Sequence, residues 1–157
     1  GALRDAVWDA AHGRASATPR DIDVAYFDPK DDGFQERRVA EELSRRAPAF
    51  AWEVRNQARM HVRHGHAPYR DTADAVSRWV ETATAVAARQ IGTDRYEFLA
   101  PHGLGDLETL RLRAVSADAR TERLMMDRAA RKGWFLRWPG LSVESRSEAL
   151  GRGGLKA

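Results

Sequence analysis

Apolar residues recur along this chain at spacings that change from helical to extended and back. In residues 2–12 they fall four positions apart, at Leu3, Val7 and Ala11, which places them on one face of a helix. In residues 21–28 apolar and aspartate positions alternate, which is the two-residue period of a strand. The chain therefore opens with a predicted helix, a polar loop and a predicted strand.

The remaining sequence continues this alternation, and it predicts one mixed α/β (α+β) domain over residues 1–141. The glycine-rich, polar residues 142–157 are predicted to be a flexible tail. In chain order we expect a helix at 34–46, a strand at 49–56 that residues 58–64 extend or pair with, a helix at 71–79, a hairpin of 82–89 with 96–100, a helix and then a strand in 106–115, and a helix at 116–131.

Composition narrows the class of protein only slightly. The 157 residues include 26 basic and 23 acidic side chains, a net charge of +3 that suits phosphate-bearing ligands. The chain has no cysteine, which excludes disulfides and thiolate metal sites and fits a cytoplasmic protein. No apolar run reaches the roughly 18 residues of a membrane helix, so no membrane association is expected. Because the sequence starts at Gly1 rather than Met, we expect a preceding segment.

Two aspartates form the most informative pattern. Asp21 and Asp23 are two residues apart in the predicted strand, so their side chains share one face about 7 Å apart. Adjacent like charges are unfavourable unless a positive group lies between them. Mg²⁺ or Mn²⁺ supplies such a charge, and a pair of these ions supports phosphoryl transfer. The alternative is that Asp21 caps a turn and Asp23 is solvated.

Glu53 is the candidate third carboxylate. It lies in the next predicted strand, on the face opposite Trp52 and Val54. The intervening helix is long enough to connect two parallel strands. If these strands are neighbours, Glu53 joins the aspartates as a metal ligand or accepts the proton of an attacking hydroxyl. The alternative is an ordinary surface glutamate.

Further positions are candidates for nucleotide binding. Gly1 opens the first helix, where free backbone N–H groups favour anions, and Arg4 follows in its first turn. Asn56 and Arg59 belong to a polar run after Glu53 that is predicted to recognise a base or an acceptor. The alternatives are a solvated arginine at position 4 and an edge strand after Glu53.

Two other clusters have both a functional and a structural interpretation. His61, His64 and His66 suggest zinc, but the fourth ligand that zinc usually needs is not evident, and an exposed hairpin is the alternative. The basic residues of 116–132, followed by Trp134 and Trp138, suggest RNA or single-stranded DNA binding. A helix packed on the domain explains the same pattern.

The order of these motifs resembles a known superfamily. GALRDAVWDAAHG followed by DIDV is similar to the start of CCA-adding enzymes and poly(A) polymerases, in the polymerase β-type nucleotidyltransferase superfamily. With WEVRNQARMH, DAVSRWVETATAVAAR and APHGLGDL, the chain resembles still more closely a bacterial family of predicted nucleotidyltransferases, over residues 1 to about 140. Ala2 departs from the Gly or Ser usual in the superfamily, which removes one phosphate contact.

The resemblance implies a polymerase β-type fold, a mixed sheet flanked by helices. It also implies metal ligation by Asp21 and Asp23, a third acid at Glu53, and phosphate contacts from Gly1 and Arg4. We therefore expect Mg²⁺- or Mn²⁺-dependent transfer of a nucleoside monophosphate from an NTP to an unknown acceptor hydroxyl on RNA, protein or a small molecule. The alternatives are a catalytically weak or inactive nucleotide- or nucleic-acid-binding module and a toxin–antitoxin-type partner.

Overall fold

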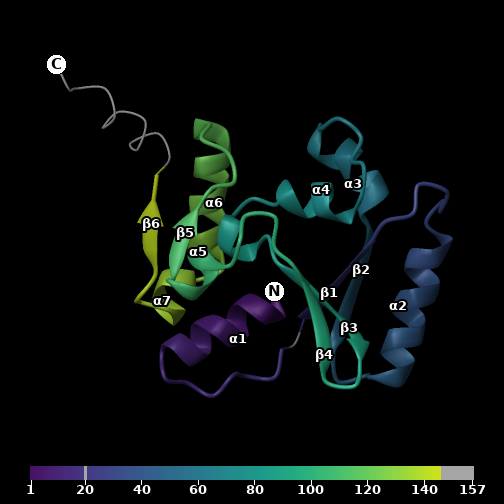
Figure 1. The fold of residues 1–157 in the computed structure, drawn as a ribbon, viewed down its shortest axis with the longest axis horizontal. Helices are drawn as coiled ribbons and strands as arrows, with labels where there is room; N and C mark the ends of the chain where they lie inside the picture. The colour runs from purple at the N-terminus through teal and green to yellow at the C-terminus, as the bar shows by residue number, and fades with distance from the viewer. Residues whose placement is uncertain (20, 146–157) are drawn as a thin grey trace.

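The computed structural model describes residues 1–19 and 21–145, which form a mixed α+β domain (Figure 1). The elements, in order, are α1 (Ala2–Ala11), β1 (Asp21–Tyr26), α2 (Phe34–Arg46), β2 (Ala51–Asn56), α3 (Gln57–His64), α4 (Thr72–Ser77), a 3₁₀ turn (Thr82–Thr84), β3 (Ala87–Gly92), β4 (Arg95–Leu99), α5 (Gly105–Glu108), β5 (Arg111–Arg113), α6 (Ala119–Arg131), α7 (Trp134–Arg137) and β6 (Ser142–Glu144).

The strands β1 and β2 form a parallel pair, joined by α2 as the crossover helix. In Figure 1, α2 lies along the side of β2. The side chains of β2 alternate as expected, with Trp52 half-buried and Val54 buried, while Glu53 is exposed. The predicted parallel pairing of these strands is confirmed.

The other described strands form separate two-stranded sheets: an antiparallel β3–β4 hairpin and a parallel β5–β6 pair. The predicted mixed α+β class is confirmed, with its strands divided among small sheets. Among the described residues, no helix is long and apolar enough to span a membrane.

Three tryptophans form the centre of the hydrophobic core. Trp8 of α1 packs edge-on against Trp134 and Trp138, with ring centroids 5.6 and 5.0 Å apart. All three are at most 1% exposed, and the Trp8 indole donates a hydrogen bond to the Leu107 carbonyl at 3.2 Å. Trp134 and Trp138 therefore hold the C-terminal elements against α1, and of the two interpretations of these aromatics the structure fits packing on the domain.

Three segments differ from the sequence-based expectation. The predicted strand 82–89 begins as the 3₁₀ turn Thr82–Thr84, and β3 lies later, over Ala87–Gly92. Residues 57–64 form the helix α3, because the Asn56 side chain caps its start and Gly65 ends it with a left-handed φ of 67°. Ser142–Glu144 form strand β6 beside β5, so the ordered domain extends past residue 141. The rest of the predicted tail, residues 146–157, lies outside the described residues.

Candidate functional site

Asp23 and Glu53 are register partners in the parallel β1–β2 pair. Neighbouring strands lie about 4.8 Å apart, and the side chains of register partners project from the same face. Both side chains are half-exposed, at 54% and 56%. The fold therefore brings together two carboxylates that are thirty residues apart in the sequence.

These two acids border a cleft of about 850 Å³. Gly1 and Arg4 of the α1 region line it beside Asp23, and residues of α3 and α6, among them His64 and Arg128, line it as well. The cleft is thus formed by elements from both ends of the described chain, around one edge of the β1–β2 pair.

Asp21 lies two residues before Asp23 on the same strand and therefore on the same face. Its register partner is Ala51, and it borders a smaller hollow of about 420 Å³ that Glu53 also lines. The three carboxylates predicted from the sequence thus share one face of the sheet, with Glu53 between the two hollows.

Asp23 and Glu53 each have a nitrogen group as their side-chain partner. Asp23 Oδ2 lies 3.4 Å from the Gly1 nitrogen, and Glu53 Oε1 lies 3.2 Å from Arg55 Nε. In the part of the chain that the structure describes, no three His, Asp or Glu side chains converge closely enough to hold one metal ion. Carboxylate oxygens are nevertheless the ligands that Mg²⁺ prefers. The donor chemistry of Asp23 and Glu53 and their shared strand face fit a divalent cation, and in this structure both carboxylates have the partners named above.

Gly1 brings the start of α1 close to Asp23. A Cβ atom at this position would lie 3.2 Å from Asp23 Oδ2, which is closer than most such contacts. Among the described residues, no side chain hydrogen-bonds the start of α1, which lies beside Asp23 at the cleft.

Arg4 borders the cleft, but its guanidinium belongs mainly to the core. Its carbon Cζ lies 4.5 Å from the ring of Trp134 and 5.3 Å from that of Trp8, and the side chain is only 9% exposed. Asp5 pairs with it, with an Nε–Oδ1 distance of 2.9 Å. This burial and pairing give Arg4 a structural role that the sequence-based phosphate contact did not anticipate.

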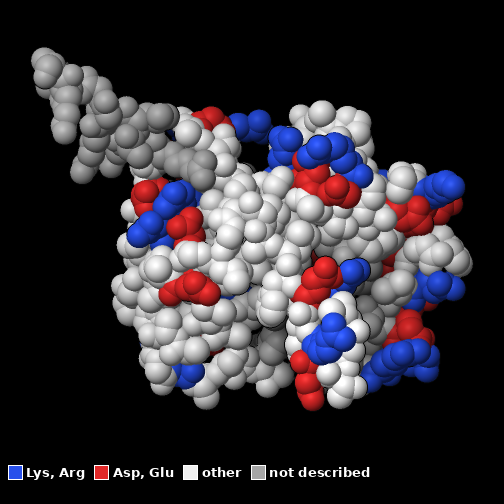
Figure 2. Space-filling model, in the orientation of Figure 1, with Lys and Arg blue, Asp and Glu red and all other residues white. Residues whose placement is uncertain are grey.

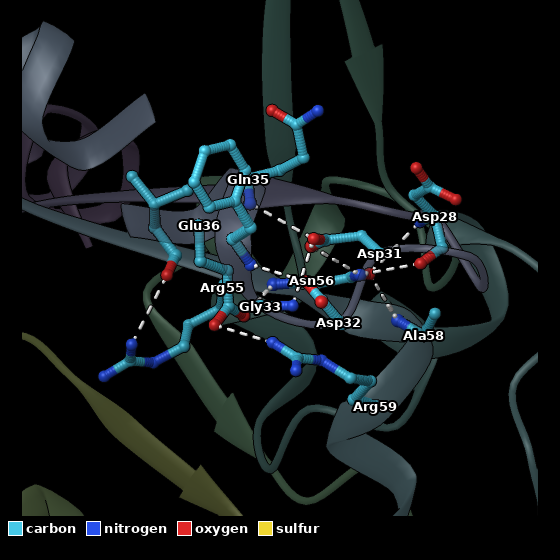
Figure 3. Close-up of polar contacts among 12 residues, drawn as sticks. Asp28, Asp31, Asp32, Gly33, Gln35, Glu36, Arg55, Asn56, Ala58 and Arg59 are labelled. Atoms are coloured by element: carbon cyan, nitrogen blue, oxygen red, sulfur yellow. Dashed lines mark hydrogen bonds and ion pairs between the residues drawn. The ribbon is translucent and has the colours of Figure 1, made fainter. Parts of the chain in front are cut away.

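Asn56 is fully buried and its amide is committed to the backbone. Oδ1 accepts hydrogen bonds from the N–H groups of Asp28 and Ala58, at 3.1 and 3.0 Å, and Nδ2 donates to the Asp28 carbonyl at 2.7 Å (Figure 3). This residue joins the loop after β1 to the start of α3. The expected nucleotide contact of Asn56 is therefore contradicted by the geometry.

Arg59 lies away from the cleft residues. Its Nη2 pairs with Glu36 Oε2 at 2.8 Å, and its guanidinium packs against Gly33 at the start of α2 (Figure 3). Arg59 does not line the cleft. Asn56 does not accompany Glu53 into the site because alternate residues of β2 project from opposite faces of the sheet. Arg59 does not because residues 57–64 are helical instead of extended.

The three histidines surround a tyrosine. His66 Nδ1 lies 2.6 Å and His64 Nδ1 3.4 Å from the hydroxyl of Tyr69, and the His61 ring contacts the same tyrosine edge-on. Burial, followed by the neighbouring charges of His66 and Arg63, lowers the pKa of His64. The cluster is thus a group of rings around Tyr69, with His64 and His66 exposed at the cleft, and the described residues provide no zinc site there.

Sequence reasoning missed several cleft arginines, including Arg55, Arg63 and Arg78. It also missed Glu81, which is fully buried and paired with Arg128. A signal existed in α6, where Thr121, Leu124 and Arg128 are spaced to share one helix face.

The fold identifies a class of protein, the nucleotidyltransferase head domains, through its similarity to a solved structure. A solved NMR structure, described as revealing a CCA-adding enzyme head domain, is similar to this chain with a TM-score of 0.78. The two sequences are 27% identical, and the similarity covers 92% of this chain and 78% of that one.

The chain belongs to a nucleotidyltransferase family whose model matches residues 1–143. A comparison with curated proteins finds no match. Family and fold together place the chain among enzymes that transfer nucleotidyl groups, and the predicted superfamily and enzyme class are confirmed.

Proposed function

We propose that this domain transfers a nucleoside monophosphate from an NTP to an acceptor hydroxyl and releases pyrophosphate. The observation that carries the proposal is the register of Asp23 with Glu53 at the edge of the large cleft. A nucleotidyltransferase needs acidic groups on one face of its sheet and a space beside them for the nucleotide. Asp23 and Glu53 provide the acidic groups, and the cleft provides the space.

Asp21 and Asp23 are the proposed holders of Mg²⁺ or Mn²⁺, with Glu53 as the third acid. When bound, the ions neutralise charge on the phosphates and on the attacking and leaving oxygens. The chain itself positions the reactants: the backbone N–H groups in the first turn of α1, beside Gly1, are the proposed donors to phosphate oxygens. Glu53 lies where it can accept the proton of the acceptor hydroxyl as the new oxygen–phosphorus bond forms.

The proposed site differs from the sequence-based one in its nucleotide contacts. Gly1 remains, because it approaches Asp23 and lines the cleft. Arg4 lines the same cleft with little exposed surface, while Asn56 and Arg59 are engaged elsewhere. We assign phosphate binding to the start of α1 and to cleft arginines instead.

The test is pyrophosphate release by the full chain, with each of the four NTPs and Mn²⁺, in the presence of RNA, protein or small-molecule acceptors. We expect release with at least one NTP and a loss of about 100-fold or more in Asp23→Asn. Glu41→Gln is the matched control, because Glu41 is exposed on α2 and outside the cleft.

Two other outcomes would favour the rival functions. NTP binding without pyrophosphate release from any acceptor would indicate a binding module that has lost turnover. Retention of a cellular phenotype and partner binding by both Asp21→Asn and Asp23→Asn would indicate a toxin–antitoxin-type partner whose action does not use the carboxylates.

A further inference from the structure

Positive charge is concentrated in the cleft. Eight arginine and lysine side chains line it against three aspartates and glutamates, whereas the whole chain has 26 basic and 23 acidic residues. On the face shown in Figure 2, by contrast, basic and acidic side chains are interspersed. The side chains that line the cleft therefore carry a larger net positive charge than the whole chain does. We expect the ligand of the cleft to be an anion.

Helix α6 supplies half of these cations. Arg120, Arg128 and Arg131 lie on the helix and Lys132 is its C-terminal cap residue. Within residues 1–19 and 21–145, Arg120, Arg131 and Lys132 have no carboxylate within ion-pair distance. These charges are thus available to a ligand, since no described acid neutralises them.

Arg128 differs from the other three basic residues because a buried carboxylate holds its guanidinium in place. Its Nε donates to Oε1 of Glu81 at 2.7 Å, and Glu81 is completely buried. The second carboxylate oxygen, Oε2, accepts a hydrogen bond from Thr84 Oγ1 at 2.6 Å. A buried carboxylate is costly unless it is paired and hydrogen-bonded, and both of its oxygens are satisfied here.

This anchoring uses only Nε of Arg128. Its side chain is 30% exposed and lines the cleft, and its terminal Nη atoms donate no hydrogen bond to any described residue. Because Nε is fixed, the guanidinium loses little further freedom when it binds an anion. A planar donor pair that is held in place in this way matches the oxygens of a phosphate group.

We propose that the cleft face of α6 is a phosphate-binding site in which Arg128 is the central donor and Glu81 is its positioning residue. The proposal rests on the proposed function only for the identity of the substrate. The phosphates come either from the triphosphate of the nucleotide or from the backbone of a nucleic-acid acceptor, and the experiment distinguishes the two sources.

The test measures binding of inorganic tripolyphosphate to the full chain by titration calorimetry, with EDTA present to remove divalent metals. We expect Arg128→Gln to weaken binding about tenfold, the size of one charge-assisted hydrogen bond. Arg123→Gln is the control, because Arg123 lies on α6, is exposed and does not line the cleft. It removes the same charge from the same helix and should change the affinity less than about twofold.

Glu81 variants test the positioning role. Glu81→Gln keeps an acceptor for Arg128 Nε and should retain the wild-type affinity, whereas Glu81→Ala should lose as much affinity as Arg128→Gln. If Glu81→Ala does not fold, Glu81→Met, which fills the same space without an acceptor for Arg128, takes its place and should show the same loss. A Glu81→Gln affinity as low as that of Arg128→Gln would overturn the positioning role.

A short single-stranded RNA, titrated under the same conditions, identifies the source of the phosphates. Weakening confined to tripolyphosphate would assign the site to the nucleotide, and weakening of RNA binding as well would assign it to an acceptor backbone. Equal effects of Arg128→Gln and Arg123→Gln, or no effect of either, would refute the site. Because the assay involves neither metal nor turnover, its failure would leave the carboxylate proposal intact, and absence of turnover would leave the anion site intact.

Discussion

Asp23 of β1 and Glu53 of β2 are direct register partners, so two acids from separate motifs share one face of a parallel strand pair. The crossover helix α2 allows this pairing, because it returns the chain so that β2 runs beside β1 in the same direction. Their position beside the large cleft, rather than the presence of acids in the sequence, is what supports a nucleotidyl-transfer site.

Because the amide of Asn56 is buried, we predict that its replacement lowers the stability of the fold strongly and changes substrate binding little. Asn56→Ala removes the α3 cap and leaves the N–H of Asp28 and its carbonyl without their partner. We expect the free energy of unfolding, measured by urea denaturation, to fall by about 2–4 kcal/mol. Gln90→Ala, at an exposed position of β3, is the control. An unchanged midpoint together with weaker NTP binding would restore the nucleotide-contact interpretation.

Arg4 is expected to behave as a core residue. Arg4→Ala removes a guanidinium that is packed against tryptophan rings and leaves Asp5 without that partner. We expect a loss of about 2 kcal/mol or more in the free energy of unfolding, with a change in tryptophan fluorescence. Arg38→Ala, at an exposed position on α2, should change neither. A variant of wild-type stability that binds tripolyphosphate more weakly would instead make Arg4 a phosphate ligand.

We predict that protonation of Asp31 lowers the stability of the fold at low pH. The hydrogen bond from Tyr26, with further donors from the backbone of Gln35 and Gly33, lowers the pKa of Asp31 from 3.8 to about 2. Because the folded-state pKa is the lower one, this carboxylate stabilises the fold fully above pH 3.8 and loses its contribution as the pH falls to about 2.

Replacement of Asp31 by Asn should therefore reduce the dependence of the unfolding free energy on pH in that interval. Urea denaturation at a series of pH values measures this dependence. Asp32→Asn, a neighbouring exposed position, serves as the control and should keep the wild-type slope. A slope in Asp31→Asn equal to that of the wild type would show that Asp31 titrates normally in the folded protein.

The part of the site that could be predicted from the sequence is the part set by local periodicity. Alternation in 21–26 and 51–56 fixes which side chains share a face, and the length of the intervening helix favours a parallel return. These two rules place Asp21 and Asp23 on one strand face and predict a parallel return, whereas the pairing of β1 with β2 and the register of Asp23 with Glu53 come from the structure.

The nucleotide contacts depended on a local choice that was wrong. Asn56 ends strand β2, within the predicted strand, and also caps the helix Gln57–His64, which Gly65 ends. Arg59 therefore lies in a helix rather than in the expected extended segment. The capping asparagine and the terminating glycine are both present in the sequence. The polar run after Glu53 also fits an edge strand, so these two signals did not decide the prediction.

Long-range packing set the remaining differences. Arg4 is enclosed by Trp134 and Trp138, about 130 residues away in the sequence, and no local pattern reveals that contact. The pairing of Glu81 with Arg128 is of the same kind, since it joins the segment after α4 to α6. Such pairs follow from the tertiary arrangement and become visible only with it.

The most direct measurement of the central claim is Mn²⁺ binding, followed by the electron paramagnetic resonance signal of the free ion, with a non-hydrolysable NTP analogue present. We predict that the full chain binds Mn²⁺, that Asp23→Asn and Glu53→Gln each weaken binding about tenfold or more, and that Glu41→Gln binds as the wild type does. Mn²⁺ binding of equal strength in the wild type and in both site variants would contradict the assignment of Asp23 and Glu53 as a metal-holding pair.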